Sequence, residues 1–477
     1  MNPLDWSLIG GPLPVIVLIA GLVGAAWLIG GRAGPAGGPR RPDGGALGWA
    51  GGSRQLGAGT GRLKPGARSR GWPLIGVPLV TGVMAGLVIT LAWLIDNVWR
   101  PFPDQLPTSV VVWSWAGLAG LALALTRLPM LYTWPRRVAA LLAGLLMLLG
   151  AVNQINGYYQ QYPTLRTALG PWLDPKPVFV QNGSTSTASL VVPGQGKSLE
   201  SVWHPPAAMP KTGKVFQVDI PGTVSGFRAR PGYLYLPPAY LTAPRPLLPV
   251  LVLLAGQPGD TRNWVDTGRI QMMMDDFASK HHGLSPVVVM PDDLGSELAN
   301  PLCVDSRLGH VQTYLTRDVP DWISSRLQVR TPAAGWAVGG FSDGGTCAIQ
   351  LATQAPGVYP VFVDISGQRA PSLGSQQRTI SRAFGGDSKA FARINPVDVM
   401  ARNRFTNDAG VFVGGDNDSV YTPQQRYVYK MARRAGMSVT LQILPGGHNW
   451  RVWRAGLARN LGWLAAQLGI TQPGRIR

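Results

Sequence analysis

Four long apolar stretches occupy the first third of the chain and limit what it can fold into. They run from about Leu8 to Gly30, Trp72 to Ile95, Ser109 to Thr126, and Val138 to about Ile155. A helix needs roughly 20 apolar residues to cross the hydrocarbon core of a bilayer. The first two stretches reach that length, and the shorter third and fourth contain no charged residue and carry Trp or Tyr near their ends, as membrane interfaces favour. We therefore expect a four-span transmembrane region over residues 1–160.

The charges of the connecting loops predict the orientation of these spans. The loop between spans one and two carries eight basic residues and one acid, and the loop between spans three and four carries three arginines. The loop between spans two and three has one arginine and two aspartates. Because loops rich in Lys and Arg stay in the cytoplasm, we expect everything after Tyr158 to be extracytoplasmic. The start of the first stretch is not basic and no A-x-A site precedes the basic loop, so we expect a retained span and not a signal peptide.

The composition is strongly basic. The chain has 43 Lys and Arg against 24 Asp and Glu, a formal charge of +19, and only 14% of its residues are charged. The loop 31–71 is rich in Gly, Pro and Arg, so we expect it to be disordered and to contact the inner leaflet. A basic balance suits an anionic lipid surface, and because the sequence has no nucleic-acid-binding motif we expect no nucleic-acid partner.

The remaining residues follow a different pattern, in which strands and helices alternate. Residues 161–200 are expected to be a linker, and 214–220 and 232–236 an antiparallel pair at a sheet edge. Six further strands are expected at 248–254, 286–290, 335–339, 361–365, 411–414 and 439–444. Alternation with helices is typical of a mostly parallel sheet covered on both faces, so we expect an α/β domain over 201–477. The segment 370–401 interrupts the alternation and is a candidate lid or substrate wall.

A glycine-rich turn between an expected strand and an expected helix carries the main chemical signal. Gly340-Phe341-Ser342-Asp343-Gly344 has the G-x-S-x-G pattern of a nucleophile elbow, in which a tight turn exposes a serine hydroxyl. The pattern arises by chance in a chain with 61 glycines, so the partners of Ser342 must also be present. In α/β-hydrolases these partners follow in the order serine, acid, histidine.

One histidine and two aspartates satisfy that order. Of the five histidines, only His448 follows Ser342, and it lies in a loop just after an expected strand. Asp416 and Asp418 follow the strand between them. An acid in this place fixes the imidazole tautomer and stabilises the imidazolium that forms. We take Asp418, deeper in the loop, as the first candidate and Asp416 as the alternate, and expect the other to form a turn or cap a helix.

Acyl chemistry also requires donors for the developing oxyanion. One should be the backbone N–H of Asp343, and the other should come from the loop after an earlier core strand. The most apolar strand, 248–254, runs into Ala255-Gly256-Gln257, so we place the second donor at the N–H of Gln257.

The cysteines and the remaining acids suggest no cofactor. Cys303 and Cys347 both fall in the outward half, where an oxidising location permits a disulfide, and two buried thiols fit equally well. Asp292-Asp293 resembles a metal-binding pair, but a loop at a strand end is the better interpretation, and we expect neither a metal nor another cofactor.

Four stretches together resemble the putative-esterase family, which includes esterase D-like enzymes and the secreted mycolyltransferases of the actinobacterial envelope. They are Gly232–Pro238, Val288–Asp293, Gly339–Gly345 and Gly446–Trp453. The last is similar to the mycolyltransferase histidine motif, in which aromatic residues follow the histidine. The resemblance covers about residues 200–470 and implies an α/β-hydrolase fold with acyl-enzyme chemistry at Ser342. This chain departs from the family in having Ala255-Gly256 in the oxyanion loop, an aspartate where the mycolyltransferases use Glu, and four spans.

Two functions of different classes follow. The first is a membrane-anchored serine esterase acting on lipid or cell-envelope esters, with an acyltransferase that moves the acyl group to an envelope alcohol as its alternative. The second is a non-catalytic membrane scaffold, in which the membrane half has a binding or transport role. Such a role would be supported by ionisable residues inside the spans, and the four stretches contain essentially none.

Overall fold

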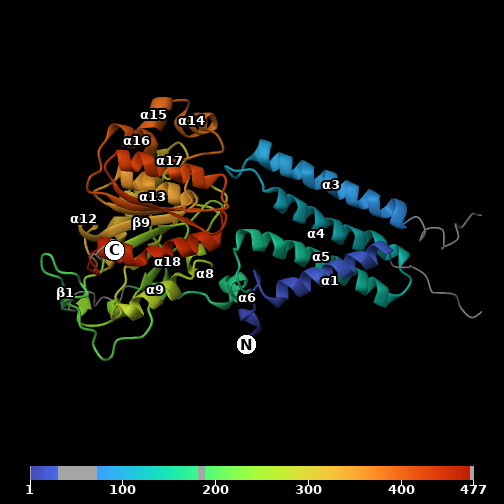
Figure 1. Cartoon of the computed structure of the whole chain (residues 1–477), viewed down its shortest axis with the longest axis horizontal. Coiled ribbons are helices and arrows are strands. Elements are labelled where there is room, and N and C mark those ends of the chain that lie inside the picture. Colours follow the sequence, from blue (N-terminus) through green and yellow to red (C-terminus); the bar gives the residue numbers. More distant parts are fainter. Residues whose placement is uncertain (1, 31–71, 181–188, 473–477) are drawn as a thin grey trace, which may run out of the picture. The chain divides into compact units, whose positions relative to one another are not determined.

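The chain divides into two compact units. The computed structural model describes residues 2–30, 72–180 and 189–472. One unit, called here the helical unit, comprises Trp6–Val98 and Leu106–Tyr158, and the other, called the α/β unit, comprises Met1–Asp5, Trp99–Gln105 and Tyr159–Arg477 (Figure 1). The main change from one unit to the other thus falls next to residue 160, but two short earlier segments also belong to the α/β unit.

The helical unit contains four helices that are long and apolar enough to cross a membrane. They are α1 (Pro12–Gly30), α3 (Val77–Leu94, with π-helical turns at Trp72–Gly76 and Ile95–Trp99), α4 (Thr108–Arg127) and α5 (Trp134–Tyr159). Each of these helices overlaps one of the four apolar stretches of the sequence. Within the described residues, the four expected apolar segments are thus confirmed as long helices. Large apolar side chains such as Leu79 and Val83 are exposed on these helices, as lipid-facing residues would be. The loop 31–71 lies outside the described residues.

Small residues and one arginine hold the helical unit together. A Cβ at Gly120 would lie 2.6 Å from the sulfur of Met147, and one at Gly144 would lie 2.7 Å from Cβ of Ala124. The two glycines therefore allow α4 and α5 to approach each other closely. Arg127, the last residue of α4, is buried and donates to the carbonyl of Leu28 at the end of α1. This ionisable group lies just beyond the expected third span.

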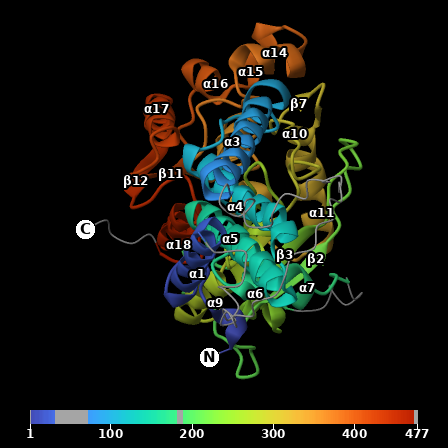
Figure 2. The same ribbon diagram turned by 90° about the vertical axis from the view of Figure 1, so that its right-hand side faces the viewer.

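The α/β unit is built on an eight-stranded sheet. Its strand order is β12-β11-β10-β9-β5-β6-β3-β2. The strands are β2 (Lys214–Val218), β3 (Gly232–Leu236), β5 (Val250–Leu254), β6 (Val287–Met290), β9 (Trp336–Phe341), β10 (Val361–Ile365), β11 (Ala409–Gly415) and β12 (Ser438–Leu444). The six strands from β12 to β6 are parallel, and β3 and β2 complete the edge as an antiparallel pair, as expected. Figure 2 shows β12 and β2 at opposite edges of this unit.

Helices cover both faces of the sheet. In Figure 1, α13 and α17 lie on one face and α9 and α18 on the other. The main helices are α9 (Ile270–Lys280), α11 (Val319–Arg326), α13 (Asp343–Gln354), α17 (Tyr421–Arg434) and α18 (Trp450–Gln467). Because both faces are covered, the central strands β5 and β9 are buried along their whole length, which accounts for their continuous apolar sequence. The expected doubly covered α/β architecture is confirmed.

Two regions outside the central sheet and its main helices contain more secondary structure than their sequences indicate. The segment 370–401 forms three short helices, α14 (Gln376–Phe384), α15 (Ser388–Ile394) and α16 (Pro396–Arg402). The expected linker contains α6 (Leu165–Ala168), α7 (Gly170–Leu173) and β1 (Leu190–Val191), which pairs with β4 (Arg245–Pro246). The guanidinium of Arg262 donates to the carbonyls of Gly170 and Asp174, which fixes part of this segment to the domain.

Candidate active site

The elbow at Ser342 is a strained turn that only small neighbours permit. Ser342 adopts φ 56° and ψ −116° between β9 and α13, and its N–H donates to the carbonyl of Ile365 at 2.8 Å. A Cβ at Gly340 would lie 2.4 Å from the carbonyl carbon of Gly344, and one at Gly344 would lie 2.4 Å from the carbonyl oxygen of Ala255. Both glycines are therefore required for the turn to close, and the strain is confined to the residue that carries the hydroxyl.

His448 lies within hydrogen-bonding distance of that hydroxyl. Its Nε2 is 2.9 Å from Oγ of Ser342. The histidine follows β12, and Asn449 next to it caps α18 by accepting from the N–H of Arg451. The imidazole stacks on the ring of Tyr421, with centroids 3.8 Å apart, and meets the edge of Trp453 at 5.1 Å. These two rings fix the plane of the imidazole.

The structure brings Asp418, and not Asp416, to the other ring nitrogen. Asp418 Oδ2 lies 3.1 Å from His448 Nδ1, and the side chain is 3% exposed. Its second oxygen accepts from the N–H groups of Val420 and Tyr421 at the start of α17. Asp416 instead accepts from the N–H of Gly446 and so connects the two loops that carry Asp418 and His448. With Nδ1 donating to Asp418, Nε2 is free to accept the serine proton.

The two residues expected to supply oxyanion donors flank the elbow. Asp343 is the first residue of α13, and the first N–H groups of a helix have no partner within the helix. Gln257 follows β5, the strand beside β9, and a Cβ at the preceding Gly256 would lie 2.6 Å from the ring of Phe341. The Gln257 side chain donates to the carbonyls of Pro101 and Leu298, which holds this loop in place. Both backbone N–H groups thus belong to segments packed around Ser342.

Comparison with known proteins agrees with this architecture. Residues 227–464 match the family model described as putative esterase. The chain is also 34% identical over 414 residues to an uncharacterized protein of Corynebacterium glutamicum, an alignment that covers 84% of this chain and 91% of the relative.

The chain belongs to the putative esterase family.

Three solved structures are similar to part of this chain. A ferulic acid esterase matches with 18% identity and a TM-score of 0.48, over 54% of this chain and 99% of the other. The S-formylglutathione hydrolase of Agrobacterium tumefaciens matches with 20% identity and a TM-score of 0.45, over 56% and 98%. The Mycobacterium tuberculosis protein MPT51 matches with 18% identity and a TM-score of 0.38, over 52% and 97%.

A cluster of aromatic side chains packs against Phe341, the residue before Ser342 in the elbow. Phe341, the residue before the nucleophile, stacks on Trp453 with centroids 4.4 Å apart and contacts Trp450 at 4.5 Å and Trp264 at 5.4 Å. The indole of Trp264 donates to the carbonyl of Leu254 at the end of β5. The aromatic residues after His448, noted in the sequence as part of a family motif, therefore connect His448, the residue before Ser342 and the end of β5.

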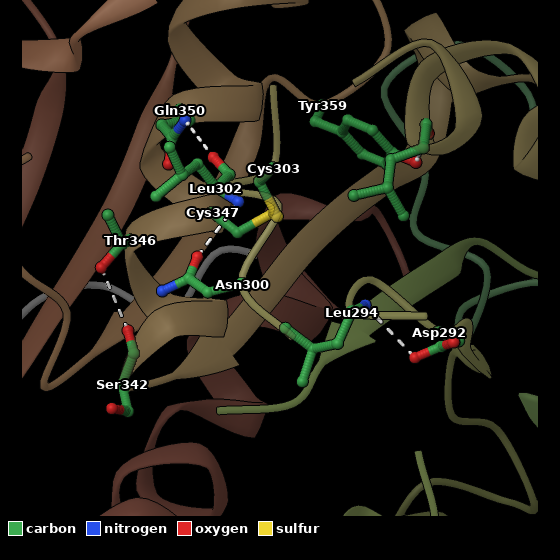
Figure 3. Close-up of a disulfide and its surroundings, with 11 residues drawn as sticks. Asp292, Leu294, Asn300, Leu302, Cys303, Ser342, Thr346, Cys347, Gln350 and Tyr359 are labelled. Atoms are coloured by element: carbon green, nitrogen blue, oxygen red, sulfur yellow. Dashed lines mark hydrogen bonds between the residues drawn. A yellow bond between two sulfur atoms is a disulfide. The ribbon is translucent and has the colours of Figure 1, made fainter. Parts of the chain in front are cut away.

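A disulfide fixes α13, the helix that follows Ser342. Cys303 and Cys347 are bonded, with Cα atoms 5.5 Å apart, and Cys347 lies in the second turn of α13 (Figure 3). Gln350 on the same helix donates to the carbonyl of Leu302. The two sulfur atoms lie close to Asp293 in a grouping with metal-ligand spacing, but because the sulfurs are bonded to each other they offer no thiolate. Asp292 has a structural role, because it pairs with Arg230 at 2.7 Å and accepts from the N–H of Leu294.

Three buried carboxyl groups near the elbow hold protons more tightly than usual. Burial raises the pKa of Asp343 to about 7 and that of Asp364 to about 8, the latter despite hydrogen bonds from Gln425 and Gly367. Burial, together with the nearby carboxyls of Asp343 and Asp292, raises the pKa of Asp293 well above its usual value. When protonated, these carboxyl groups add no negative charge next to the elbow.

Sequence reasoning missed Tyr421 and Asp104. Tyr421 stacks on the imidazole, and its hydroxyl donates to Asp104, which comes from the loop between the second and third candidate spans. Nothing local to either residue marks it, because the two are 317 positions apart. The available hint was weak: Asp104 is one of four acidic residues before position 165, and it lies in the loop expected on the same side as the catalytic half.

Proposed function

We propose that this protein is a membrane-anchored serine esterase that cleaves acyl esters of lipid or cell-envelope substrates. One observation carries the proposal: Ser342 Oγ, the two ring nitrogens of His448 and the carboxylate of Asp418 form a continuous hydrogen-bonded series with distances of 2.9 and 3.1 Å. A serine on a strained elbow, with a base and an orienting acid, is the arrangement that activates a hydroxyl for attack. Membership of the esterase family supports the same chemistry.

The reaction proceeds through an acyl-enzyme. His448 Nε2 takes the proton of Ser342 as Oγ attacks the ester carbonyl, and the backbone N–H groups of Asp343 and Gln257 stabilise the oxyanion. When the tetrahedral intermediate collapses, the C–O bond to the alcohol breaks and His448 returns the proton to the leaving oxygen. Water, deprotonated by the same histidine, then attacks the acyl-enzyme and releases the carboxylic acid and free Ser342.

The substrate class follows from where the chain is anchored. Four candidate spans precede the main segment of the α/β unit, Tyr159–Arg477, and the charges of their loops favour an extracytoplasmic catalytic half. An esterase held there meets esters that are embedded in the membrane or attached to the envelope. The net charge of +19 adds attraction to anionic lipid headgroups.

Labelling with a fluorophosphonate probe tests the nucleophile directly. Full-length protein in detergent micelles should react with the probe and hydrolyse p-nitrophenyl butyrate, and Ser342→Ala should abolish both. Ser325→Ala, which changes an exposed serine on α11, is the matched control and should leave both intact. If Ser342→Ala retains hydrolysis, Ser342 is not the nucleophile.

An acyltransferase is the alternative outcome of the same acyl-enzyme. The resemblance of Gly446–Trp453 to the mycolyltransferase histidine motif favours it. The two functions differ only in whether water or a second alcohol attacks the acyl carbonyl carbon of the acyl-enzyme and displaces Ser342. Incubating the enzyme with a lipid ester and a sugar alcohol, then measuring free acid against new ester by mass spectrometry, separates them. Acid as the only product would exclude transfer to that alcohol.

A further inference from the structure

The loop Trp99–Gln105 enters the α/β unit and contacts three of the segments that surround the catalytic serine. The carbonyl of Pro101 accepts from the side chain of Gln257 in the oxyanion loop at 2.8 Å. The carbonyl of Pro103 lies 3.3 Å from where a Cβ at Gly374 would be, in the segment that leads into α14. Asp104 accepts from the hydroxyl of Tyr421, the first residue of α17. This short segment between two candidate spans thus contacts the loop of Gln257, the segment before α14 and the first residue of α17.

Tyr421 connects this loop to the histidine and the acid of the site. Its N–H donates to Asp418 Oδ1 at 2.9 Å, and its ring stacks on His448 at 3.8 Å with an interplanar angle of 19°. Its hydroxyl donates to Asp104 and receives a longer hydrogen bond of 3.4 Å from Gln368. The tyrosine is 4% exposed, so its ring has little freedom to turn away. Asp104 therefore acts on the base through one intervening residue.

We propose that Asp104 is a positioning residue of the esterase site, which holds Tyr421 against the imidazole of His448 and thereby makes the loop between the second and third candidate spans part of the catalytic apparatus. This inference rests on the proposed function, because it concerns the same base. It assigns to that loop a role in catalysis beyond connecting two helices.

The physical effect is on the transition state more than on substrate binding. His448 is neutral before the reaction and becomes an imidazolium as it takes the serine proton. A cation such as the imidazolium of His448 is attracted to the face of an aromatic ring. A carboxylate that accepts a hydrogen bond from the phenol hydroxyl, as Asp104 does from Tyr421, increases the electron density of that ring. Partial desolvation raises the pKa of Asp104, an effect that His448 opposes and Asp418 reinforces, although the residue keeps contact with solvent. Asp104, His448 and Asp418 all contact Tyr421.

The test measures kcat and KM separately in the full-length protein. Asp104→Ala and Tyr421→Phe should each lower kcat for p-nitrophenyl butyrate by roughly three- to tenfold, the range that a desolvated cation–ring contact represents, with KM nearly unchanged. The double variant should be no slower than the slower single variant, because both changes remove one shared contact. Asp104→Asn keeps an acceptor for the hydroxyl but loses the charge, so its kcat should lie between those of Asp104→Ala and the wild type.

Two matched controls remove neighbouring groups that do not touch the site. Gln105→Ala changes the exposed next residue of the same loop, and Tyr427→Phe removes an exposed hydroxyl from the same helix as Tyr421. Both should keep wild-type kcat. The inference is overturned if Asp104→Ala and Tyr421→Phe have wild-type kcat, if they alter only KM, or if their effects multiply in the double variant. Those results differ from an active Ser342→Ala variant, which would refute the proposed function itself.

Discussion

Asp418 and Asp416 lie two residues apart on one loop, yet their contacts give them separate tasks. Asp418 faces His448 Nδ1, whereas Asp416 accepts from the N–H of Gly446. We expect Asp418→Asn to lower kcat/KM for a p-nitrophenyl ester by roughly 10³- to 10⁴-fold, because an amide at this place favours the wrong imidazole tautomer. Asp416→Asn keeps an oxygen for Gly446 and should retain nearly full activity. The assignment would be reversed if Asp416→Asn were the more damaged variant.

Asp364 makes stability depend on pH. Its pKa rises from an ordinary value near 3.9 in the unfolded chain to about 8 in the folded protein, mainly through burial. The folded state therefore holds a proton that the unfolded state releases, so this contribution to stability is complete below about pH 4 and is lost as the pH rises towards 8. In that window each pH unit lowers the free energy of unfolding by up to about 1.4 kcal/mol.

Asp364→Asn should remove that part of the pH dependence. The amide oxygen can still accept from Gly367 and Gln425, as Oδ1 of Asp364 does. Denaturant unfolding of the α/β unit at pH 5, 6.5 and 8 should give a flatter profile for the variant than for the wild type. Asp343 and Asp293 remain to titrate, so the slope should decrease without vanishing. Identical slopes in the two proteins would show that Asp364 keeps its ordinary pKa.

At the scale of elements, the disulfide joins the loop after β6 to α13, the helix that follows Ser342. Its cysteines are 44 positions apart, and closing a loop of that length removes about 4 kcal/mol of chain entropy from the unfolded state. The double variant Cys303→Ala/Cys347→Ala should therefore melt at a lower temperature than the wild type. Because α13 stays packed against β9 and β10, kcat should change much less than stability.

Treatment with a reducing agent provides the control for that experiment. Reduction should lower the melting temperature of the wild type towards that of the double variant and leave the double variant unaffected. A wild type whose melting temperature does not respond to complete reduction would mean that the bond contributes little to folding.

Elements whose signals are local could be predicted from the sequence. The central strands β5, β6 and β9 have continuous apolar runs, and the elbow needs Gly340 and Gly344 within four residues of each other, so their places follow from short patterns. The segment 161–200 was expected to be a linker because its composition is polar. Its short helices depend on distant partners instead, as in the bonds from Arg262 to Gly170 and Asp174, and composition does not record such partners.

At the scale of the whole molecule, the order of residues indicated Ser342, His448 and the two aspartates, but not the loop that adjoins them. The family order rule selects groups within the α/β unit. Asp104 belongs to the short segment Trp99–Gln105, which lies between two candidate spans in the chain and reaches Tyr421 only because it folds as part of the α/β unit. A single aspartate in a short loop has no distinguishing pattern, so this contact could be found only in three dimensions.

The division of the chain also bears on membrane orientation. Three segments share the α/β unit: Met1–Asp5, Trp99–Gln105 and Tyr159–Arg477. Two candidate spans separate each segment from the next, and an even number of crossings returns a chain to the same side of a bilayer. The fold of the α/β unit is thus compatible with four membrane crossings and would not be compatible with three. This parity alone does not choose the side, which depends on the basic loops.

Reporter fusions determine the side. We expect alkaline phosphatase fused after Arg477 to be active and green fluorescent protein fused there to be dark, and the reverse for fusions within the basic loop 31–71. Replacing the eight basic residues of that loop with Gln should weaken this preference, whereas replacing eight basic residues of the α/β unit should not, because positive charges act on topology mainly in short loops. The disulfide supplies independent support, since bonds of this kind persist in oxidising compartments. A fluorescent C-terminal fusion would place the esterase in the cytoplasm, where extracytoplasmic envelope esters are out of reach and the Cys303–Cys347 bond would be reduced.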